Sequence, residues 1–290
     1  MLLQQLLNGV LASGIYALFA VGFTIIFGIM GVLNMAHADL AVVAAFAIIW
    51  AVSAGFSPLP AVLIAVVATL GLALIVERLA MRPGRRFKGE AAIEMPLIAT
   101  IGAGMIIQNA AALIFGNKVI FFPWQLPAFV SIGGFLVSQG LLISACVALA
   151  LLVALEILID RTSFGRQIRA VAQNPTAARI MGIDTNFVIV ATVALTAAIA
   201  GIAGCLVGLS YGFVAPMMGI PYAIKGLVAM IIGGVGSLRG AVLGALLIGL
   251  IEAMAVTWLG SQVKDVAVFA ALLAVLVMKP GGLIATPGAR

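Results

Sequence analysis

Apolar residues follow one another in long runs along the whole chain, separated by short polar connections. Nine runs recur: Val10–Ile29, Leu40–Val52, Leu59–Val76, Met95–Phe115, Phe135–Ile159, Phe187–Leu209, Ala223–Val235, Ala241–Trp258 and Val266–Met278. The ~30 Å hydrocarbon core of a bilayer takes about 20 helical residues to cross. Most runs are long enough, while Leu40–Val52 and Ala223–Val235 are short. The pattern predicts an all-α polytopic membrane protein with eight or nine transmembrane or re-entrant helices, depending on whether residues 40–52 cross or re-enter.

The composition excludes a water-soluble fold. Apolar residues make up 64% of the chain and charged residues 8%, whereas soluble domains have roughly 45–50% and about 25%. Because so few polar residues separate the runs, the chain has no room for a soluble domain. Residues 1–290 are therefore expected to form a single transmembrane domain. The net charge of +6 is clustered at helix ends, which indicates membrane topology and not nucleic-acid binding. Cys146 and Cys205 lie inside apolar runs, so we expect neither a disulfide nor a metal site.

Two connections hold most of the charge, residues 77–94 and residues 160–186. The positive-inside rule places both of them in the cytoplasm. Counting spans outward from these fixed points puts the amino terminus outside and the carboxyl terminus, with Lys279, inside. Lys264 then lies outside and is a small exception.

The two halves of the chain are loosely similar, because each has a long run followed by a short, interrupted one. The first interruption is Gly28–Asp39, and the second runs from Tyr211 to Pro221, with the glycines of 233–236 further on. Paired broken segments indicate a transport site built from discontinuous helices. Gly and Pro at membrane depth are tolerated only where protein or a wet cavity satisfies the freed backbone groups.

Several polar residues lie where the pattern predicts membrane. Asn34, His37 and Asp39 separate two apolar runs, and placing Asp at a helix centre costs roughly 2.5–3.5 kcal/mol, so such groups tend to mark a transport pathway. The alternative is a cytoplasmic turn in which Asp39 starts the next helix. His37, the single histidine, is a candidate proton relay, although no partner for it is evident.

Other polar residues fall within runs further along the chain. Gln108 and Asn109 either join helices by hydrogen bonds or line the pathway, and Lys225 and Glu252 either pair, extend to the membrane interface or face a cavity. The glycine-rich stretch 233–240 is not a nucleotide-binding loop, because no strand precedes it and no Gly-Lys-Ser/Thr ends it. Its glycines favour close helix packing or a sharp turn.

The connection 160–186 predicts a short helix that needs a partner. Asn174 is a capping residue, Pro175 suits the first helical position, and Gly182 ends the helix. A short, exposed, Ala-rich helix is unstable alone and has to dock on another surface. The alternative, an amphipathic segment lying on lipid headgroups, would need more bulky apolar residues than Ile180 and Met181.

The sequence resembles a known family of membrane proteins. Four stretches carry the resemblance: Gly22–Asp39; Ile101 through Gln108-Asn109 to Gly116; Phe164-Gly-Arg166 through Asn174 to Ile183; and Lys225 through Gly233–Gly244 to Glu252. They are similar to the LivH-like permease subunits of branched-chain amino acid ABC importers, over nearly the whole chain. Family members usually have Gly after the histidine, where this chain has Ala38.

The resemblance implies a non-catalytic subunit that forms half of a translocation pathway. It implies a second, M-type permease, two ATPase subunits in the cytoplasm and an external substrate-binding protein, in a bacterial inner membrane. ATP would bind only to the partner subunits, and this chain would hold no cofactor. The coupling helix that docks on an ATPase would comprise Asn174, Pro175, Ala177, Ala178, Arg179 and Gly182. The candidate pathway residues are Asn34, His37, Asp39, Gln108, Asn109 and Lys225.

The sequence leaves the substrate open among branched-chain amino acids, other amino acids, urea, amides and aromatic acids. The alternative function is a passive channel for urea-type or amide-type solutes without ATP coupling. A docking helix argues against this alternative, because a channel needs none. A secondary transporter has thin support, because only His37 and Asp39 point to it and the chain is short for that class. A purely structural subunit would leave the buried polar residues and the broken segments unexplained.

Overall fold

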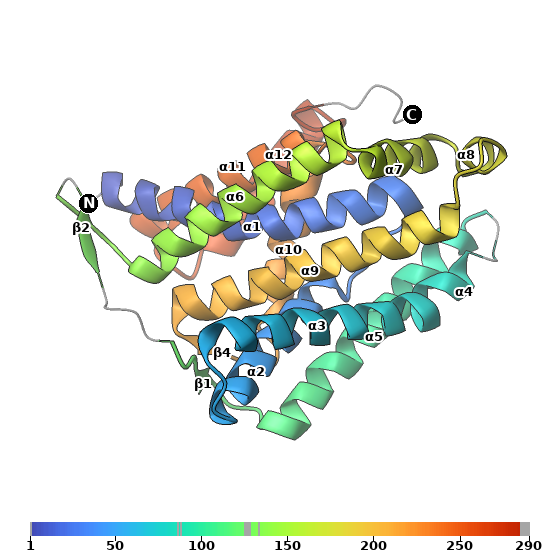
Figure 1. Cartoon of the computed structure of the whole chain (residues 1–290). Helices are drawn as coiled ribbons and strands as arrows, with labels where there is room; N and C mark the ends of the chain where they lie inside the picture. The colour runs from blue at the N-terminus through green and yellow to red at the C-terminus, as the bar shows by residue number, and fades with distance from the viewer. Residues whose placement is uncertain (1, 86, 88, 125–128, 133, 285–290) are drawn as a thin grey trace.

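The computed structural model describes residues 2–85, 87, 89–124, 129–132 and 134–284 (Figure 1). The helices in chain order are α1 (Leu2–Met30), α2 (His37–Ser53), α3 (Pro58–Val76), the π-helical η1 (Glu77–Met81), α4 (Arg82–Gly84), α5 (Ala91–Phe115), α6 (Gln139–Arg161), α7 (Ser163–Gln173), α8 (Pro175–Ile180), α9 (Thr185–Tyr211), α10 (Gly219–Gly233), α11 (Leu238–Leu259) and α12 (Lys264–Met278). The short strands form two antiparallel pairs. Strand β1 (Ile120–Phe121) pairs with β4 (Phe213–Val214), and β2 (Val130–Ile132) pairs with β3 (Phe135–Val137).

Each of the nine apolar runs contains or overlaps a helix, which confirms the expected all-α membrane fold. Six helical segments of the described chain are long and apolar enough to cross a bilayer: α1, α3 continued to Gly84, α5, α6, α9 and α11. Helix α2, with 17 residues, is about 25 Å long at 1.5 Å per residue. Since α10 and α12 have 15 residues each, the expected number of eight or nine spans is not confirmed.

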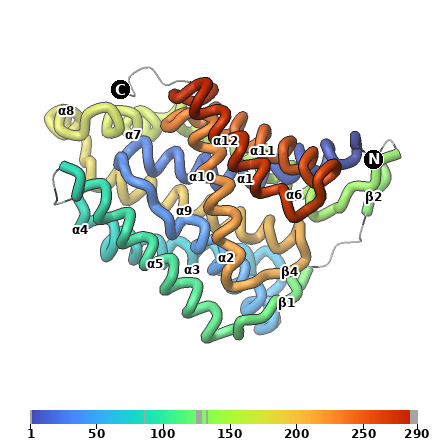
Figure 2. Tube along the Cα trace, turned by 180° about the vertical axis from the view of Figure 1, so that it is seen from behind, coloured from blue at the N-terminus to red at the C-terminus, as the bar shows by residue number. Residues whose placement is uncertain are grey.

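Helix α1 is the centre of the molecule. It packs against α6 and α9 on one side and against α10 and α11 on the other, as the two opposite views show (Figures 1 and 2). Its apolar residues form a helix because a backbone in lipid has to satisfy its own hydrogen bonds. Glycine allows the closest contact with α11: a Cβ on Gly9 would overlap the carbonyl oxygen of Gly249, and a Cβ on Gly249 that of Gly9. Small residues at such crossings let helix backbones approach closely.

The two halves of the chain each contain a long helix followed by a short one. Gly31 (φ +64°) follows α1 and Gly212 (φ +75°) caps α9, and both adopt the left-handed conformation that glycine tolerates best. Helices α1 and α9 run in opposite directions (Figure 1), while the short helices α2 and α10 contact each other. The broken helices expected from the sequence therefore meet inside the bundle.

The glycine-rich stretch 233–240 forms a tight turn between α10 and α11. Added Cβ atoms on Gly233 and Gly240 would overlap each other's backbone, and the Ser237 hydroxyl accepts the amide hydrogen of Gly240 at 3.1 Å to cap α11. This is the close packing and sharp turn that the sequence favours.

The structure differs from the expected elements near the membrane surfaces. The run starting at Phe135 begins as strand β3, and α6 starts only at Gln139. The first basic connection is partly helical, because α3 continues through η1 to Gly84. The second contains α7, an additional helix before α8. Both basic connections lie at one end of the molecule, and the strand pairs lie at the other (Figure 1).

Candidate functional site

Helix α2 begins beside the middle of the bundle and not at the end of α1. After Gly31 the chain turns back, so that the ring of His37 lies 5.2 Å from the ring of Phe23 in α1. Thr100 of α5 holds this turn, since its hydroxyl accepts the amide hydrogen of Met35 at 3.2 Å. The first turn of α2 is therefore enclosed by protein at membrane depth, as irregular backbone requires there.

His37 is fully buried among aromatic rings. The rings of Phe23 and Phe19 both approach it edge-on, at 5.2 and 6.2 Å between centroids, and Gly22 leaves the space that the imidazole fills. Neither ring nitrogen has a hydrogen-bond partner among the described residues. His37 therefore packs against aromatic rings, and its expected place in the pathway stays a prediction.

Asp39 and Gln108 form the polar contact of this region. The buried carboxylate of Asp39, in the first turn of α2, accepts a hydrogen bond from the Gln108 amide at 2.8 Å. Gly104 of α5 and Gly219 of α10 leave room for its two oxygens, because a Cβ at either position would overlap them. The amino-terminal ends of α2 and α10 therefore meet at one carboxylate.

The other two polar residues of the first half lie apart from this contact. Asn34 is buried, and its side-chain oxygen has no hydrogen-bond partner among the described residues. The amide of Asn109 is exposed and donates to the carbonyl of Met105 on its own helix, at 2.7 Å. The structure thus brings Asp39 and Gln108 together and turns Asn109 away from them.

Lys225 belongs to a second polar cluster. Its ammonium lies 2.7 Å from the Glu252 carboxylate of α11 and donates to the hydroxyl of Tyr16 at 3.1 Å. Tyr16 in turn donates to Glu252 at 2.9 Å, and the Lys264 ammonium lies 3.5 Å from the same carboxylate. Of the alternatives left open by the sequence, Lys225 and Glu252 pair with each other.

Sequence reasoning missed the aromatic part of this second cluster. The chain has three tyrosines, and all three line one cavity of about 230 Å³ together with Lys225, Glu252 and Lys264: Tyr16, Tyr211 and Tyr222. They come from α1, from the end of α9 and from the start of α10. Because tyrosine is rare in this sequence, the positions of Tyr211 and Tyr222 at the two ends of the second broken segment could have indicated a functional cluster there.

Helix α8 has the local structure expected from the sequence. The Asn174 side chain accepts the amide hydrogens of Thr176 and Ala177, at 3.0 and 2.9 Å, and Gly182 (φ +84°) follows the last turn. Ala178 is fully buried against the body of the protein. By contrast Ile180 and Met181, at the end of α8, are 82% and 69% exposed, and α8 projects from the molecule (Figure 1).

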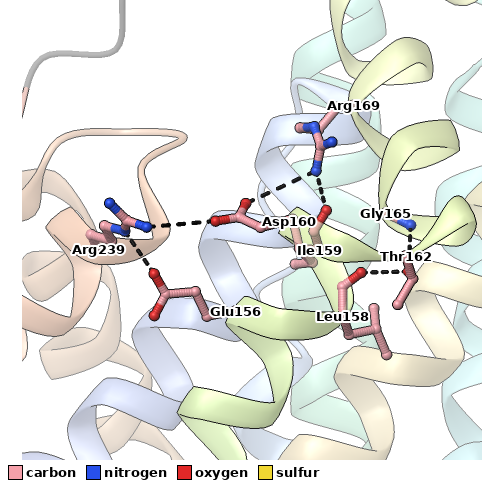
Figure 3. Close-up of polar contacts among 8 residues, drawn as sticks. All are labelled: Glu156, Leu158, Ile159, Asp160, Thr162, Gly165, Arg169 and Arg239. Carbon is pink, nitrogen blue, oxygen red and sulfur yellow. Dashed lines mark hydrogen bonds and ion pairs between the residues drawn. The ribbon is translucent and has the colours of Figure 1, made fainter.

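Helix α7, which holds α8 in place, was also missed. Its signals are Thr162, which caps the helix by accepting the amide hydrogen of Gly165 at 3.1 Å, and buried Ile168 and Val171 on one face. Arg169 on α7 donates to the carbonyl of Ile159 (Figure 3).

A chain of ion pairs continues from α7 to α6 and α11. Arg169 lies 3.9 Å from Asp160, and Arg239 of α11 reaches Asp160 at 3.6 Å and Glu156 at 2.7 Å (Figure 3). These groups border a cavity of about 460 Å³ between α1, α6, α7 and α11. The segment carrying α8 is thus connected to two membrane helices.

The chain has relatives among known proteins. Residues 5–278 match the family described as the permease component of branched-chain amino acid transport systems. The chain belongs to this family. The permease protein BraD of the high-affinity branched-chain amino acid transport system of Pseudomonas aeruginosa is 34% identical, covering 98% of this chain and 96% of the relative. LivH of the corresponding system of Escherichia coli is 33% identical with the same coverage.

A solved structure has the same fold. PsaBC from Streptococcus pneumoniae in complex with Fab aligns over 97% of this chain and 93% of that chain, with a TM-score of 0.55 and 15% identity. The family match and the relatives confirm the expected family and the function of a permease component, and the solved structure confirms the fold class. Nothing in the comparisons supports the passive channel, and the roles of individual residues stay predictions.

Proposed function

We propose that this permease forms half of the translocation pathway of an ATP-driven importer of branched-chain or related amino acids. The observation that carries the proposal is α8, a capped and exposed six-residue helix held on a membrane body of the permease family. Such a helix is too short to be stable by itself. Its exposed tip therefore fits a docking element for a motor subunit.

The proposed assembly contains a second, M-type permease, two ATPase subunits and an external substrate-binding protein. ATP binds to the ATPase subunits, and this chain contributes no cofactor and no catalytic group. We assign Asn174, Pro175, Ala177, Arg179 and Gly182 to the contact with an ATPase. Ala178 supports that contact indirectly, because it lies on the buried face of α8 and packs against the rest of the protein.

The proposed orientation in the inner membrane puts α7 and α8 in the cytoplasm. Basic connections favour the cytoplasmic side, and both of them lie at the α8 end of the molecule (Figure 1). The amino terminus and the strand pairs then face the binding protein, and the carboxyl terminus is cytoplasmic.

The proposed pathway runs past the two short helices. Asp39 and Gln108 lie where α2 and α10 meet, with Asn34 and His37 just before Asp39 in the chain, and Lys225 lies nearly two turns further along α10. Broken helices move with their flanking segments, so this is where two conformations can differ in their contacts with a solute. The position of Asn109, exposed and hydrogen-bonded to its own helix, favours a contact with another subunit.

The test is uptake of labelled L-leucine by cells expressing the complete importer, compared with cells lacking the ATPase subunits. We expect uptake only with the ATPase. Crosslinking from Ala177→Cys, which is exposed, should capture the ATPase, whereas Ala178→Cys is buried and serves as the matched control. Uptake without the ATPase would instead support the passive channel.

A further inference from the structure

The cavity lined by the three tyrosines combines both signs of charge with aromatic faces. Its lining residues come from α1, α9, α10, α11 and α12 and from strand β4, and these helices lie side by side in the view of Figure 2. Tyr222 stacks on Phe19 at 5.4 Å and lies 6.2 Å from Tyr16 and 6.3 Å from Tyr211, between ring centroids. The ammonium of Lys225 lies 4.7 Å from the centre of the Tyr16 ring.

The cavity holds more charged groups than the single ion pair of Lys225 and Glu252. Lys225 and Glu252 neutralise each other at 2.7 Å, which leaves the ammonium of Lys264, 38% exposed and 3.5 Å from Glu252, as an excess cation. Asp265 lies beside it in an adjoining hollow that Lys225 also lines. A buried ion pair costs desolvation that apolar residues would avoid, and ionisable residues within a membrane usually serve a function.

We propose that this cavity binds an α-amino acid as its zwitterion during transport; this inference rests on the proposed function. A simple anion would be repelled by Glu252, and a simple cation by Lys225 and Lys264. A ligand with a carboxylate and an ammonium a few ångströms apart satisfies both signs: its carboxylate pairs with Lys264 and its ammonium with Glu252. The faces of the tyrosine rings add cation–π attraction for the ammonium.

The remaining wall of the cavity selects the side chain. Val207, Phe213, Met218 and Pro221 line it, so the ligand side chain meets apolar surface. Its burial is favourable by roughly 25 cal/mol per Å². The ligand class is therefore an amino acid with an aliphatic side chain.

The first experiment separates ligand binding from bracing of the helices. The double variant Lys225→Met, Glu252→Gln removes both buried charges and leaves only the partly exposed Lys264 without its contact to Glu252, and replacing a buried pair is often neutral for stability. We expect normal assembly and thermal unfolding, with the rate of ATP-driven L-leucine uptake reduced by about tenfold or more, as for a lost charged hydrogen bond. Uptake at the wild-type rate would show that the pair is only a brace and would overturn the proposal.

The second experiment leaves the pair intact and decides the question if the double variant fails to assemble. Lys264→Gln removes the excess cation and should also reduce leucine uptake roughly tenfold, whereas Lys118→Gln, an exposed lysine outside the cavity, should not. Unchanged uptake in Lys264→Gln would contradict the proposal. If the wild-type importer moves no aliphatic amino acid, the proposed function itself fails; if it does and this variant is unaffected, only the present inference fails.

The third experiment tests the charge of the ligand directly. Tyr211→Cys, in a Cys146→Ala background, places a thiol at a position that is 42% exposed in tyrosine. L-Leucine should slow its reaction with a maleimide, while 4-methylpentanoate and 3-methylbutylamine, each with one of the two charges, should not. A cysteine at Val119, exposed but outside the cavity, controls for general effects. Equal protection by all three compounds would contradict zwitterion recognition.

Discussion

The contact between Gly22 and His37 ties α1 to the start of α2. A methyl group on residue 22 would overlap the imidazole ring, which is itself fully buried. We therefore expect Gly22→Ala to lower the free energy of unfolding by about 1–3 kcal/mol, the usual cost of overpacking. Gly28→Ala on the same helix is the matched control, because nothing lies within 4 Å of its added Cβ. Thermal unfolding in detergent measures both, and equal stability of the two variants would contradict the tight contact.

Two ion pairs of α11 illustrate how burial sets the contribution of a charge. Removing the lysine in Lys225→Gln leaves the enclosed Glu252 without its main partner, which we expect to cost ~3 kcal/mol, since Lys264 offsets part of the loss. Arg239→Gln breaks contacts in which the arginine side chain is 70% and the carboxylates are 44% and 47% exposed, and such pairs contribute about 0–1 kcal/mol. Unfolding temperatures should therefore fall clearly in the first variant and little in the second. Similar shifts in both would refute the comparison.

At the scale of elements, the Asn174 cap determines whether α8 keeps its shape. The side chain bonds two of the first amide hydrogens of a six-residue helix, and loss of such a cap costs ~1 kcal/mol. We expect Asn174→Ala to leave global stability unchanged and to reduce ATP-driven leucine uptake roughly fivefold. Asn174→Asp retains a capping oxygen and should transport nearly normally. Uptake has to be normalised to permease abundance, and equal uptake in the two variants would argue against a docking role.

The sequence predicted those elements whose signals are local. Long apolar runs produced helices at the expected places, and the pattern from Asn174 to Gly182 produced a capped short helix, because both depend on neighbouring residues only. Helix α7 was missed although its apolar residues repeat at helical spacing, since the adjacent arginines gave the segment the character of a polar connection. Strands β1 and β4 are far apart in the chain, so no local pattern indicated their pairing, and the neighbouring strands β2 and β3 have only three residues each.

The candidate site was predictable only in part, for the same reason. Asp39 and Lys225 stood out as charges among apolar residues, but their partners lie 69 and 27 positions away in sequence. Tyr16 meets Glu252 across 236 positions. Such contacts follow from the packing of α1, α10 and α11, which hydropathy alone does not specify.

At the scale of the whole molecule, α11 joins the two ends of the protein. Arg239 near its start takes part in the ion pairs with α6 that continue to α7, and Glu252 near its other end lies in the tyrosine cavity. A helix in a membrane is rigid enough to carry displacement along its length. If α7 and α8 dock on a motor subunit as proposed, a shift of these helices has a continuous route of packed elements to the cavity.

The orientation of the whole molecule gives the last prediction. If the basic end is cytoplasmic, then α8 is inside and the connection after α5 is outside. In a Cys146→Ala background, Val119→Cys should react with a membrane-impermeant maleimide in intact spheroplasts, whereas Ile180→Cys should react only after permeabilisation. Both positions are well exposed in the structure, so accessibility differs only through the membrane. The buried Cys205 should stay unlabelled in either case, and the reverse pattern at positions 119 and 180 would invert the proposed topology and detach α8 from any cytoplasmic motor.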